Sequence, residues 1–228
     1  DSVKSRGLGD VYKRQDILCE LSEGNKKKLN QLSILLKYDL EKKVFKIDSP
    51  FIAGTEGETI SKIISLFPDL KEKKLTEWLS IRSRDVLGKP IDNLHSTLNQ
   101  IKKMKITMGI ATNDKESSAL HQLEKNSIKQ FFKYIYGSDS GYGFKPNTGM
   151  QEEFLRVTNL HPKNVMMVGD SIADIISGNN IGMISIGVLT GPLKREHLEN
   201  KANFVLDSIS DLPKPVSYTH LTLPTILP

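Results

Sequence analysis

Apolar residues recur with the spacing of a helix through the first third of the chain. Between residues 16 and 84, the segments 26–36, 59–67 and 70–81 place apolar residues three and four positions apart, as one face of a helix does. In the first segment these positions are held by Leu29, Leu32, Leu35 and Leu36. We find no convincing alternation of apolar and polar residues in this part, so we predict a small, purely helical module over residues 16–86.

From residue 87 onward, short apolar runs alternate with helical stretches. The predicted strands are 106–111, 134–137, 165–168, 183–188 and 204–206. The predicted helices between them are 91–104, 116–124, 148–157 and 173–180. Strands that alternate with helices are joined by right-handed crossovers into a parallel sheet with helices on both faces. The sequence therefore predicts a three-layer α/β/α core over residues 87–215, and the turn at Gly88-Lys89-Pro90 marks its boundary with the helical module.

The two ends of the chain join neither pattern. Residues 1–15 lack helical or strand periodicity, and residues 216–228 read VSYTHLTLPTILP. Both segments resemble translated adapter sequence at the ends of fragmentary genes, so we expect them to be non-native and leave them out of the fold prediction. A disordered native tail at each end is the alternative.

Composition excludes several classes of function. With 228 residues and 38% hydrophobic content, the chain has enough apolar residues for one core, or one core and a small module. The 32 basic and 27 acidic residues are mixed in short runs, which does not form the basic stripe of a nucleic-acid-binding protein. Cys19 is the single cysteine, and no apolar stretch is long enough for a membrane span or a secretory signal. We therefore expect a soluble, cytoplasmic protein, monomeric or homodimeric, that binds neither nucleic acid nor membrane.

Polar residues follow two of the predicted strands at the sheet edge where parallel α/β proteins bind ligands. The strand at 106–111 leads into Thr112-Asn113-Asp114, whose hydroxyl and backbone N–H groups suit phosphate oxygens. The same residues are also common helix caps. After the strand at 134–137, Lys145 precedes Pro146, and its ammonium group could stabilise a phosphoryl group. An ordinary surface lysine in a turn is the alternative.

A third polar segment contains two carboxylates. The buried strand at 165–168 leads through Gly169 to Asp170, and Asp174 follows four residues later in the first turn of a predicted helix. Mg²⁺ is usually held by one or two carboxylates together with phosphate and water, so this segment is a candidate Mg²⁺ site. The alternative is that these residues cap the helix and complement its dipole.

Taken in order, these three segments resemble motifs two, three and four of the haloacid dehalogenase superfamily. The resemblance extends to residues 137–139, 177–183 and 187–191, which look like its phosphoglycolate-phosphatase-like branch. It implies a Rossmann-like core, a small α-helical cap at residues 16–86, and a Mg²⁺-dependent phosphatase. The implied reaction is hydrolysis of a small phosphorylated metabolite, such as 2-phosphoglycolate, through an aspartyl-phosphate.

The resemblance also implies roles for individual residues. Thr112 and Lys145 would be catalytic, and both would bind the phosphoryl group together with the backbone of Asn113. Asp170 would coordinate Mg²⁺ directly. Asp174 would hold the water molecules of the metal or orient Lys145.

The nucleophile motif of the superfamily, Asp-x-Asp-Gly-Thr on the first core strand, has no match in the sequence. Asp10 is followed by Val11-Tyr12-Lys13, and Asp16 lacks a second aspartate at the required spacing. The nucleophile and the general acid are therefore expected to be absent, as after a truncation between the first strand and the cap. We expect the chain as written to be catalytically silent and poorly stable, with a gap in its sheet.

Other functions remain open at this point. A phosphosugar mutase or a pyrophosphatase of the same superfamily would have the same core motifs. A non-catalytic relative that binds a phosphorylated metabolite or a protein is a further alternative, whereas a 2-haloacid dehalogenase is disfavoured because its chemistry needs no metal. Residues 51–58 are a candidate substrate-specificity loop or a glycine-rich connection between helices.

Overall fold

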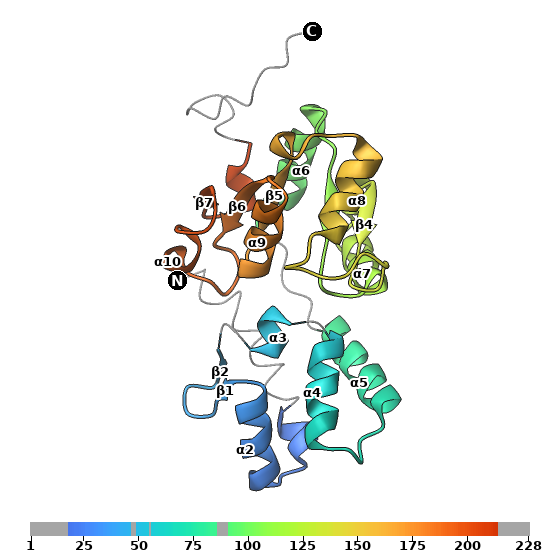
Figure 1. Cartoon of the computed structure of the whole chain (residues 1–228), viewed down its shortest axis with the longest axis vertical. Helices are drawn as coiled ribbons and strands as arrows, with labels where there is room; N and C mark the ends of the chain where they lie inside the picture. The colour runs from blue at the N-terminus through green and yellow to red at the C-terminus, as the bar shows by residue number, and fades with distance from the viewer. Residues whose placement is uncertain (1–17, 47–48, 55, 86–90, 214–228) are drawn as a thin grey trace. The chain divides into compact units, whose positions relative to one another are not determined.

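The computed structural model divides the chain into two compact units, residues 1–89 and residues 90–228 (Figure 1). The residues that it describes are 18–46, 49–54, 56–85 and 91–213. The terminal segments expected to be non-native, 1–15 and 216–228, lie outside the described residues, as does the boundary turn at 88–90.

Unit 1 is built mainly of helices. They are α2 (Lys26–Leu35), α3 (Pro50–Ala53), α4 (Glu56–Leu66) and α5 (Glu72–Asp85), and residues 18–22 are also helical. The three helices predicted from the apolar spacing are confirmed as α2, α4 and α5, with ends shifted by up to four residues. The start of α2 is set by Asn25, whose side-chain oxygen accepts hydrogen bonds from the backbone N–H groups of Lys27 and Lys28.

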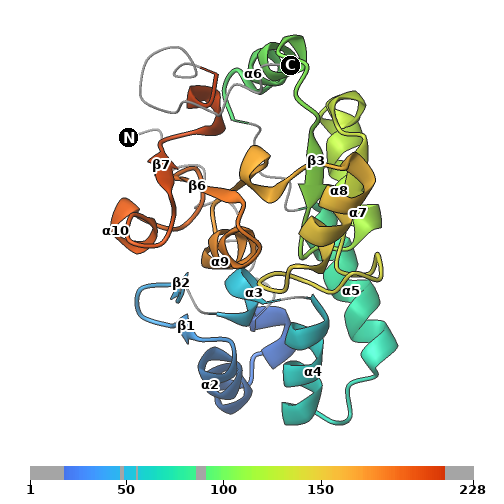
Figure 2. The ribbon, with the colours of Figure 1, turned by 45° about the horizontal axis from the view of Figure 1, so that its top comes forward.

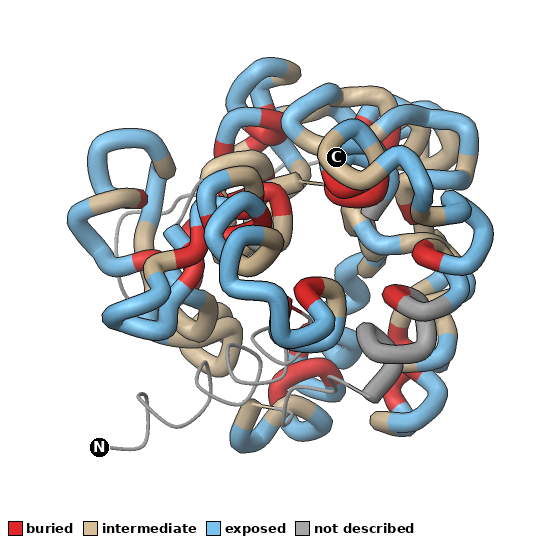
Figure 3. Tube along the Cα trace, turned by 90° about the horizontal axis from the view of Figure 1, so that it is seen from below, coloured by how far each residue is buried: buried red, intermediate tan, exposed pale blue. Residues whose placement is uncertain are grey.

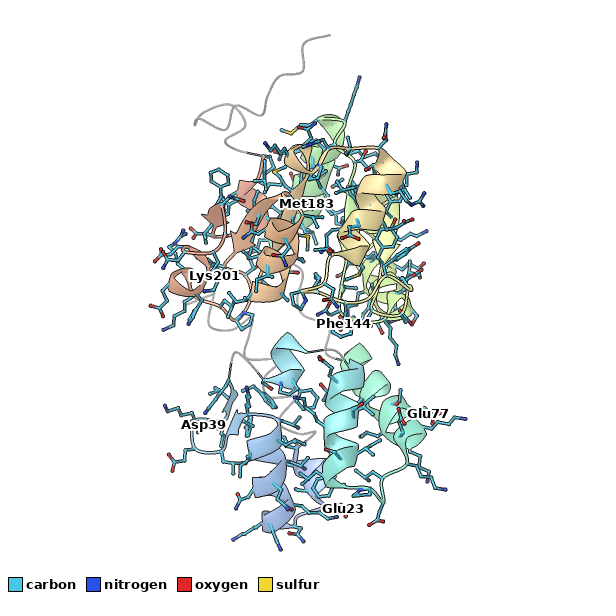
Figure 4. The ribbon with its side chains drawn as sticks, viewed as in Figure 1. Glu23, Asp39, Glu77, Phe144, Met183 and Lys201 are labelled. Carbon is cyan, nitrogen blue, oxygen red and sulfur yellow. The ribbon has the colours of Figure 1, made fainter. Side chains whose placement is uncertain are left out.

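Unit 1 also contains a β-hairpin, so the prediction of a purely helical module was wrong in this respect. Strands β1 (Tyr38–Asp39) and β2 (Val44–Phe45) pair antiparallel. Asp39, labelled in Figure 4, forms the turn by accepting hydrogen bonds from the backbone of Glu41 at 3.0 Å and of Lys42 at 2.8 Å. Strands of two residues are too short to show an alternating pattern in a sequence, which explains the missed hairpin.

The hairpin contributes aromatic side chains to the core of unit 1. The rings of Tyr38 and Phe45 lie 4.7 Å apart, and Phe51 packs edge-on against Phe45 at 5.4 Å. The aliphatic part of this core consists of Leu18, Leu32, Leu36, Ile60, Ile63, Leu75 and Leu79. Residues 51–58 fall in α3 and the first turn of α4, with Thr55 outside the described residues, so most of this segment is helix rather than loop, and Gly54 follows α3 as the described part of a connection between the two helices.

Unit 2 is a Rossmann-like α/β core made of parallel strands and helices. Its strands are β3 (Gly109–Ala111), β4 (Tyr134–Tyr136), β5 (Met166–Gly169), β6 (Ile184–Val188) and β7 (Phe204–Leu206). Its helices are α6 (Leu94–Lys103), α7 (Glu116–Lys125), α8 (Gly149–Thr158), α9 (Ile172–Asn180) and α10 (Arg195–Leu198), with 3₁₀ turns at Lys129–Phe131, Pro162–Asn164 and Ile209–Asp211. The five predicted strands and four predicted helices are confirmed, and α10 was missed because four residues show no helical period.

The strands of unit 2 form two separate parallel sheets in the part of the chain that the structure describes. One sheet pairs β3 with β4, and the other has the order β5-β6-β7. Figures 1 and 2 show the two sheets on opposite sides of the unit. Within the described ranges, β3 therefore pairs with a strand on one side only, and so does β5. This agrees with the gap that we expected in the sheet.

Burial of the strand residues fits this divided sheet. Parallel strands are ordinarily covered on both faces and strongly buried. The apolar residues Ile110, Met166, Met167 and Val168 are nevertheless only half-buried, whereas β6, paired on both sides, is buried over residues 185–188. Figure 3 shows that buried stretches of the trace are short and alternate with exposed ones. The half-buried strands are those with an unpaired edge.

Helices of unit 2 pack against its strands. Helix α8 contacts β3, α7 contacts β4, and α9 contacts both β5 and β6. The contact of α9 with β5 is close because Gly178 has no side chain: a Cβ there would lie 2.8 Å from Cβ of Met167. Among the described helices, none has both the length and the apolar content needed to cross a membrane.

Candidate active site

Lys145 lies between the carboxyl end of β3 and helix α9. Its Nζ donates hydrogen bonds to the carbonyl oxygen of Ala111 at 2.6 Å and to Oδ1 of Asp174 at 2.5 Å. The side chains of Lys145 and Asp174 are only 10% and 6% exposed. Lys145 is therefore not the ordinary surface lysine that was the alternative reading of the sequence. A buried ammonium group at the carboxyl end of a parallel strand lies where α/β proteins bind anionic ligands.

Asn113 fixes the main chain of Lys145. The Asn113 side-chain amide donates to the carbonyl oxygen of Lys145 at 2.9 Å, and its oxygen accepts from the N–H of Lys145 at 2.8 Å. We expected the backbone of Asn113 to bind phosphate and did not expect its side chain to bind Lys145. The two residues lie 32 positions apart, so the sequence gave no signal for this contact, although an amide carries the donor and the acceptor that it needs.

Thr112 forms a turn at the end of β3. Its N–H donates to the carbonyl oxygen of Tyr136 at 2.9 Å, and its hydroxyl accepts from the N–H of Asp114 at 3.1 Å. This second bond closes a local turn before helix α7, which begins at Glu116, so Thr112 does not cap that helix as the alternative had it. A hydroxyl can accept one hydrogen bond and donate another, so the contact leaves Thr112 able to donate to a phosphate oxygen.

Both carboxylate oxygens of Asp174 are engaged by neighbouring residues. Oδ1 accepts from Lys145, while Oδ2 accepts from the N–H and the hydroxyl of Ser171 at 3.0 and 2.6 Å. Ser171 in turn accepts from the N–H of Asp174 at 3.2 Å, which completes a capping box at the start of α9. Of the two roles expected for Asp174, this geometry fits the orientation of Lys145 better than the binding of a metal ion.

Asp170 has a different environment. Partial burial and the nearby charge of Asp174 raise the pKa of the Asp170 carboxyl, and Lys145 opposes this rise. The carboxylate lies against Gly191, where a Cβ would be 2.0 Å from Oδ2 of Asp170. A carboxylate that is costly to ionise gains from a bound cation, so Asp170 is a better candidate than Asp174 for a metal ligand.

The donor set at this place is compatible with Mg²⁺. Within the described ranges, no three His, Cys, Asp or Glu side chains gather closely enough to hold a metal ion by themselves. Mg²⁺ commonly takes one or two carboxylates and completes its coordination with phosphate and water. The carboxylate of Asp170 could be the protein ligand in such a site.

Comparisons with known proteins identify the family of the chain. The family described as haloacid dehalogenase-like hydrolase matches residues 33–188, which include Thr112, Lys145 and Asp174. The chain belongs to the haloacid dehalogenase-like hydrolases. The resemblance inferred from the motifs is confirmed, and with it the assignment as an enzyme of the hydrolase class.

The relatives of this haloacid dehalogenase-like hydrolase are named for different activities. Pyrophosphatase PpaX of Bacillus mycoides is 28% identical over 166 residues, which cover 72% of this chain and 76% of the relative. The crystal structure of a predicted phosphoglycolate phosphatase from Haemophilus somnus superposes with a TM-score of 0.63 at 16% identity, covering 86% and 89% of the two chains. A β-phosphoglucomutase structure from Clostridium difficile gives 0.62 at 18% identity, covering 89% and 86%. At these identities, the two structures establish the fold.

Residues 137–139 of this hydrolase contact the start of helix α7. Asp139 accepts a hydrogen bond from the N–H of Glu116 at 2.8 Å and so caps helix α7. The Glu116 carboxylate accepts from the hydroxyl of Ser140 at 2.5 Å. A Cβ at Gly137 would lie 2.2 Å from the nitrogen of Glu116, so only glycine allows this approach. The segment therefore holds the loop that leads through Phe144, labelled in Figure 4, to Lys145.

Proposed function

We propose that the protein encoded by this sequence is a Mg²⁺-dependent phosphomonoesterase that acts on a small phosphorylated metabolite, with 2-phosphoglycolate as the first candidate. The observation that carries this proposal is the buried ammonium group of Lys145, held between Ala111 and Asp174. A fixed positive charge offsets the negative charge that develops on phosphoryl oxygens, and it needs no reorganisation during the reaction.

Each residue of the site receives a role in this proposal. Thr112 donates its hydroxyl to a phosphoryl oxygen, and the backbone of Asn113 assists while its side chain holds Lys145. Lys145 binds the phosphoryl oxygens, Asp174 orients Lys145, and Asp170 binds Mg²⁺. The metal ion, when bound, neutralises phosphate charge.

The nucleophile is proposed to come from an Asp-x-Asp segment that the described residues do not contain. We infer that this segment is a strand that pairs with the free edges of β3 and β5, which the described part of the chain leaves in separate sheets. Its first aspartate would form the aspartyl-phosphate, and its second would protonate the leaving alcohol and then activate water. Without this strand, the chain is proposed to be inactive.

A pyrophosphatase is the second candidate, favoured by the 28% identity to Pyrophosphatase PpaX. Both activities need the same phosphoryl site, and they differ in the leaving group. A phosphosugar mutase or a non-catalytic binding protein is less well supported, since a binding protein has no need of a lysine, two carboxylates and a strand-end hydroxyl together.

Two proteins would test the proposal: the chain as written, and the chain preceded by an apolar strand with an Asp-x-Asp-Gly-Thr motif. We expect the extended protein to hydrolyse 2-phosphoglycolate or a generic phosphate ester with Mg²⁺ and to lose activity with EDTA. Replacing the first aspartate by asparagine is the matched control. Faster hydrolysis of pyrophosphate would select the second candidate. Turnover by the chain as written, or none by a folded extended protein, would contradict the proposal.

A further inference from the structure

Gln151 is a buried amide in the first turn of α8. It is 2% exposed, and its Nε2 donates to the hydroxyl of Ser177 at 2.9 Å, with Sδ of Met167 at 3.8 Å. Its Oε1 is buried and accepts no hydrogen bond from the residues that the structure describes. A buried amide with an unpaired acceptor is less favourable than a leucine or methionine of similar size, so packing alone does not account for this glutamine.

Ser177 extends this contact to the backbone of the site. It lies fully buried in α9, and its hydroxyl donates to the carbonyl oxygen of Asp174 at 2.9 Å. Because the hydroxyl hydrogen is used in that bond, Ser177 accepts from the NH₂ group of Gln151, which fixes the orientation of the amide. Two consecutive hydrogen bonds therefore connect α8 to the residue whose carboxylate holds Lys145.

Two contacts thus join the segment 145–151 to helix α9. Helix α8 begins four residues after Lys145, and α9 carries Asp174 in its first turn. The Lys145–Asp174 ion pair is one link, and the Gln151–Ser177 hydrogen bond is the other. We propose that Gln151 is a positioning residue that acts through Ser177 to fix Asp174, and thereby the ammonium group of Lys145. The proposal rests on the proposed function only in that it assigns Lys145 to the phosphoryl group.

The test uses the full chain as written and observes the ammonium group of Lys145 by ¹H–¹⁵N NMR. The signal is assigned from its loss in Lys145→Arg. In Gln151→Leu and Ser177→Ala, we expect the hydrogen exchange of this ammonium group to rise on the order of 10-fold, because its carboxylate partner is less well fixed. The double variant should show no further rise, since both residues act in one chain of bonds.

Thr158→Val is the matched control. Thr158 also lies on α8, but its hydroxyl donates within the helix, to the carbonyl oxygen of Phe154 at 2.6 Å. Its substitution should leave the Lys145 signal unchanged. An unchanged signal in both Gln151→Leu and Ser177→Ala would overturn the proposal, as would fully additive effects in the double variant. If Gln151→Leu does not fold, Ser177→Ala decides the question by the same signal.

A kinetic measurement on the extended protein with the restored nucleophile separates this proposal from the proposed function. There, Gln151→Leu should lower kcat on the order of 10-fold and leave KM within about twofold, because a shifted Lys145 affects the transition state more than the bound substrate. A change in KM alone would contradict a positioning role. If the extended protein hydrolyses no phosphate compound while the ammonium group responds as expected, the proposed function fails and the positioning role stands.

Discussion

The carboxylate of Asp170 occupies the space that a side chain at residue 191 would fill. A Cβ built on Gly191 would lie 2.0 Å from Oδ2 of Asp170 and 2.5 Å from its Cβ. The loop that follows β6 thus determines where the carboxylate at the end of β5 lies. This contact makes Gly191 part of the proposed Mg²⁺ site, although it has no group that could bind a metal.

Gly191→Ala should displace Asp170 and weaken Mg²⁺ binding. Ligands that bind the folded state raise its stability, so excess Mg²⁺ should increase the thermal midpoint of the unsubstituted chain. We expect this increase to disappear in Gly191→Ala, together with a loss of about 1–3 kcal/mol in the free energy of unfolding from overpacking. Thermal unfolding with and without Mg²⁺ measures both effects.

Gly187→Ala is the control for this prediction. Gly187 lies in β6, and its Cβ would be 3.0 Å from Cδ1 of Leu198, the flexible end of an aliphatic side chain. This variant should lose some stability and keep the response to Mg²⁺. An equal response in both variants would show that Asp170 does not contribute to the binding of the metal.

Asp170→Asn should stabilise the metal-free protein at neutral pH. Burial, with the charge of Asp174, raises the folded-state pKa of Asp170, so the folded state binds this proton more tightly than the unfolded state. The proton bound by Asp170 therefore stabilises the folded parent protein. This stabilisation is fully present below the unfolded-state pKa of Asp170 and is lost as the pH rises through its folded-state pKa. In EDTA, the variant should therefore unfold at a higher temperature than the parent at pH 7, and the difference should shrink toward pH 3. A lower midpoint for the variant at pH 7 would contradict this.

Removing one member of the Lys145–Asp174 pair should be strongly destabilising. Both side chains are buried, and an uncompensated buried charge costs about 3–5 kcal/mol. Lys145→Met and Asp174→Asn should each lose about that amount in urea unfolding, and the double variant should recover part of it. Lys163→Met, at an exposed lysine, should change stability by less than about 0.5 kcal/mol. A double variant as unstable as the sum of the single variants would show that the two residues are not coupled.

Most of the fold could be predicted because strands and helices with several residues on one face leave a periodic signal. Strand β5 and helix α9 were found from their apolar runs, and β7 was found at its observed bounds of Phe204–Leu206. The β1–β2 hairpin and α10 are shorter than one full pattern, so periodicity could not reveal them. The turn of the hairpin depends on individual contacts, such as the hydrogen bonds that Asp39 accepts.

The candidate site could be predicted in part. The end of a strand is a local property, so Thr112, Lys145 and Asp170 could be named from the sequence as a group at one edge of the sheet. The contacts that hold Lys145 and Asp170 in place are not local. The Asn113 amide on Lys145 and Gly191 beside Asp170 bring together residues 32 and 21 positions apart, and only the folded chain determines which of them meet.

Ser49 provides a test of unit 1. Its buried hydroxyl donates to the carbonyl oxygen of Leu36 at 2.5 Å and accepts from the N–H of Phe51 at 3.2 Å. It thereby joins the end of α2 to the start of α3. Ser49→Ala removes both bonds and leaves two backbone groups without this partner, so we expect a loss of about 1–3 kcal/mol. Urea unfolding followed by circular dichroism measures it. The control Ser65→Ala loses an exposed bond to the carbonyl oxygen of Lys62 and should change stability by less than about 0.5 kcal/mol. Equal losses in the two variants would show that the Ser49 link contributes nothing beyond a surface hydroxyl.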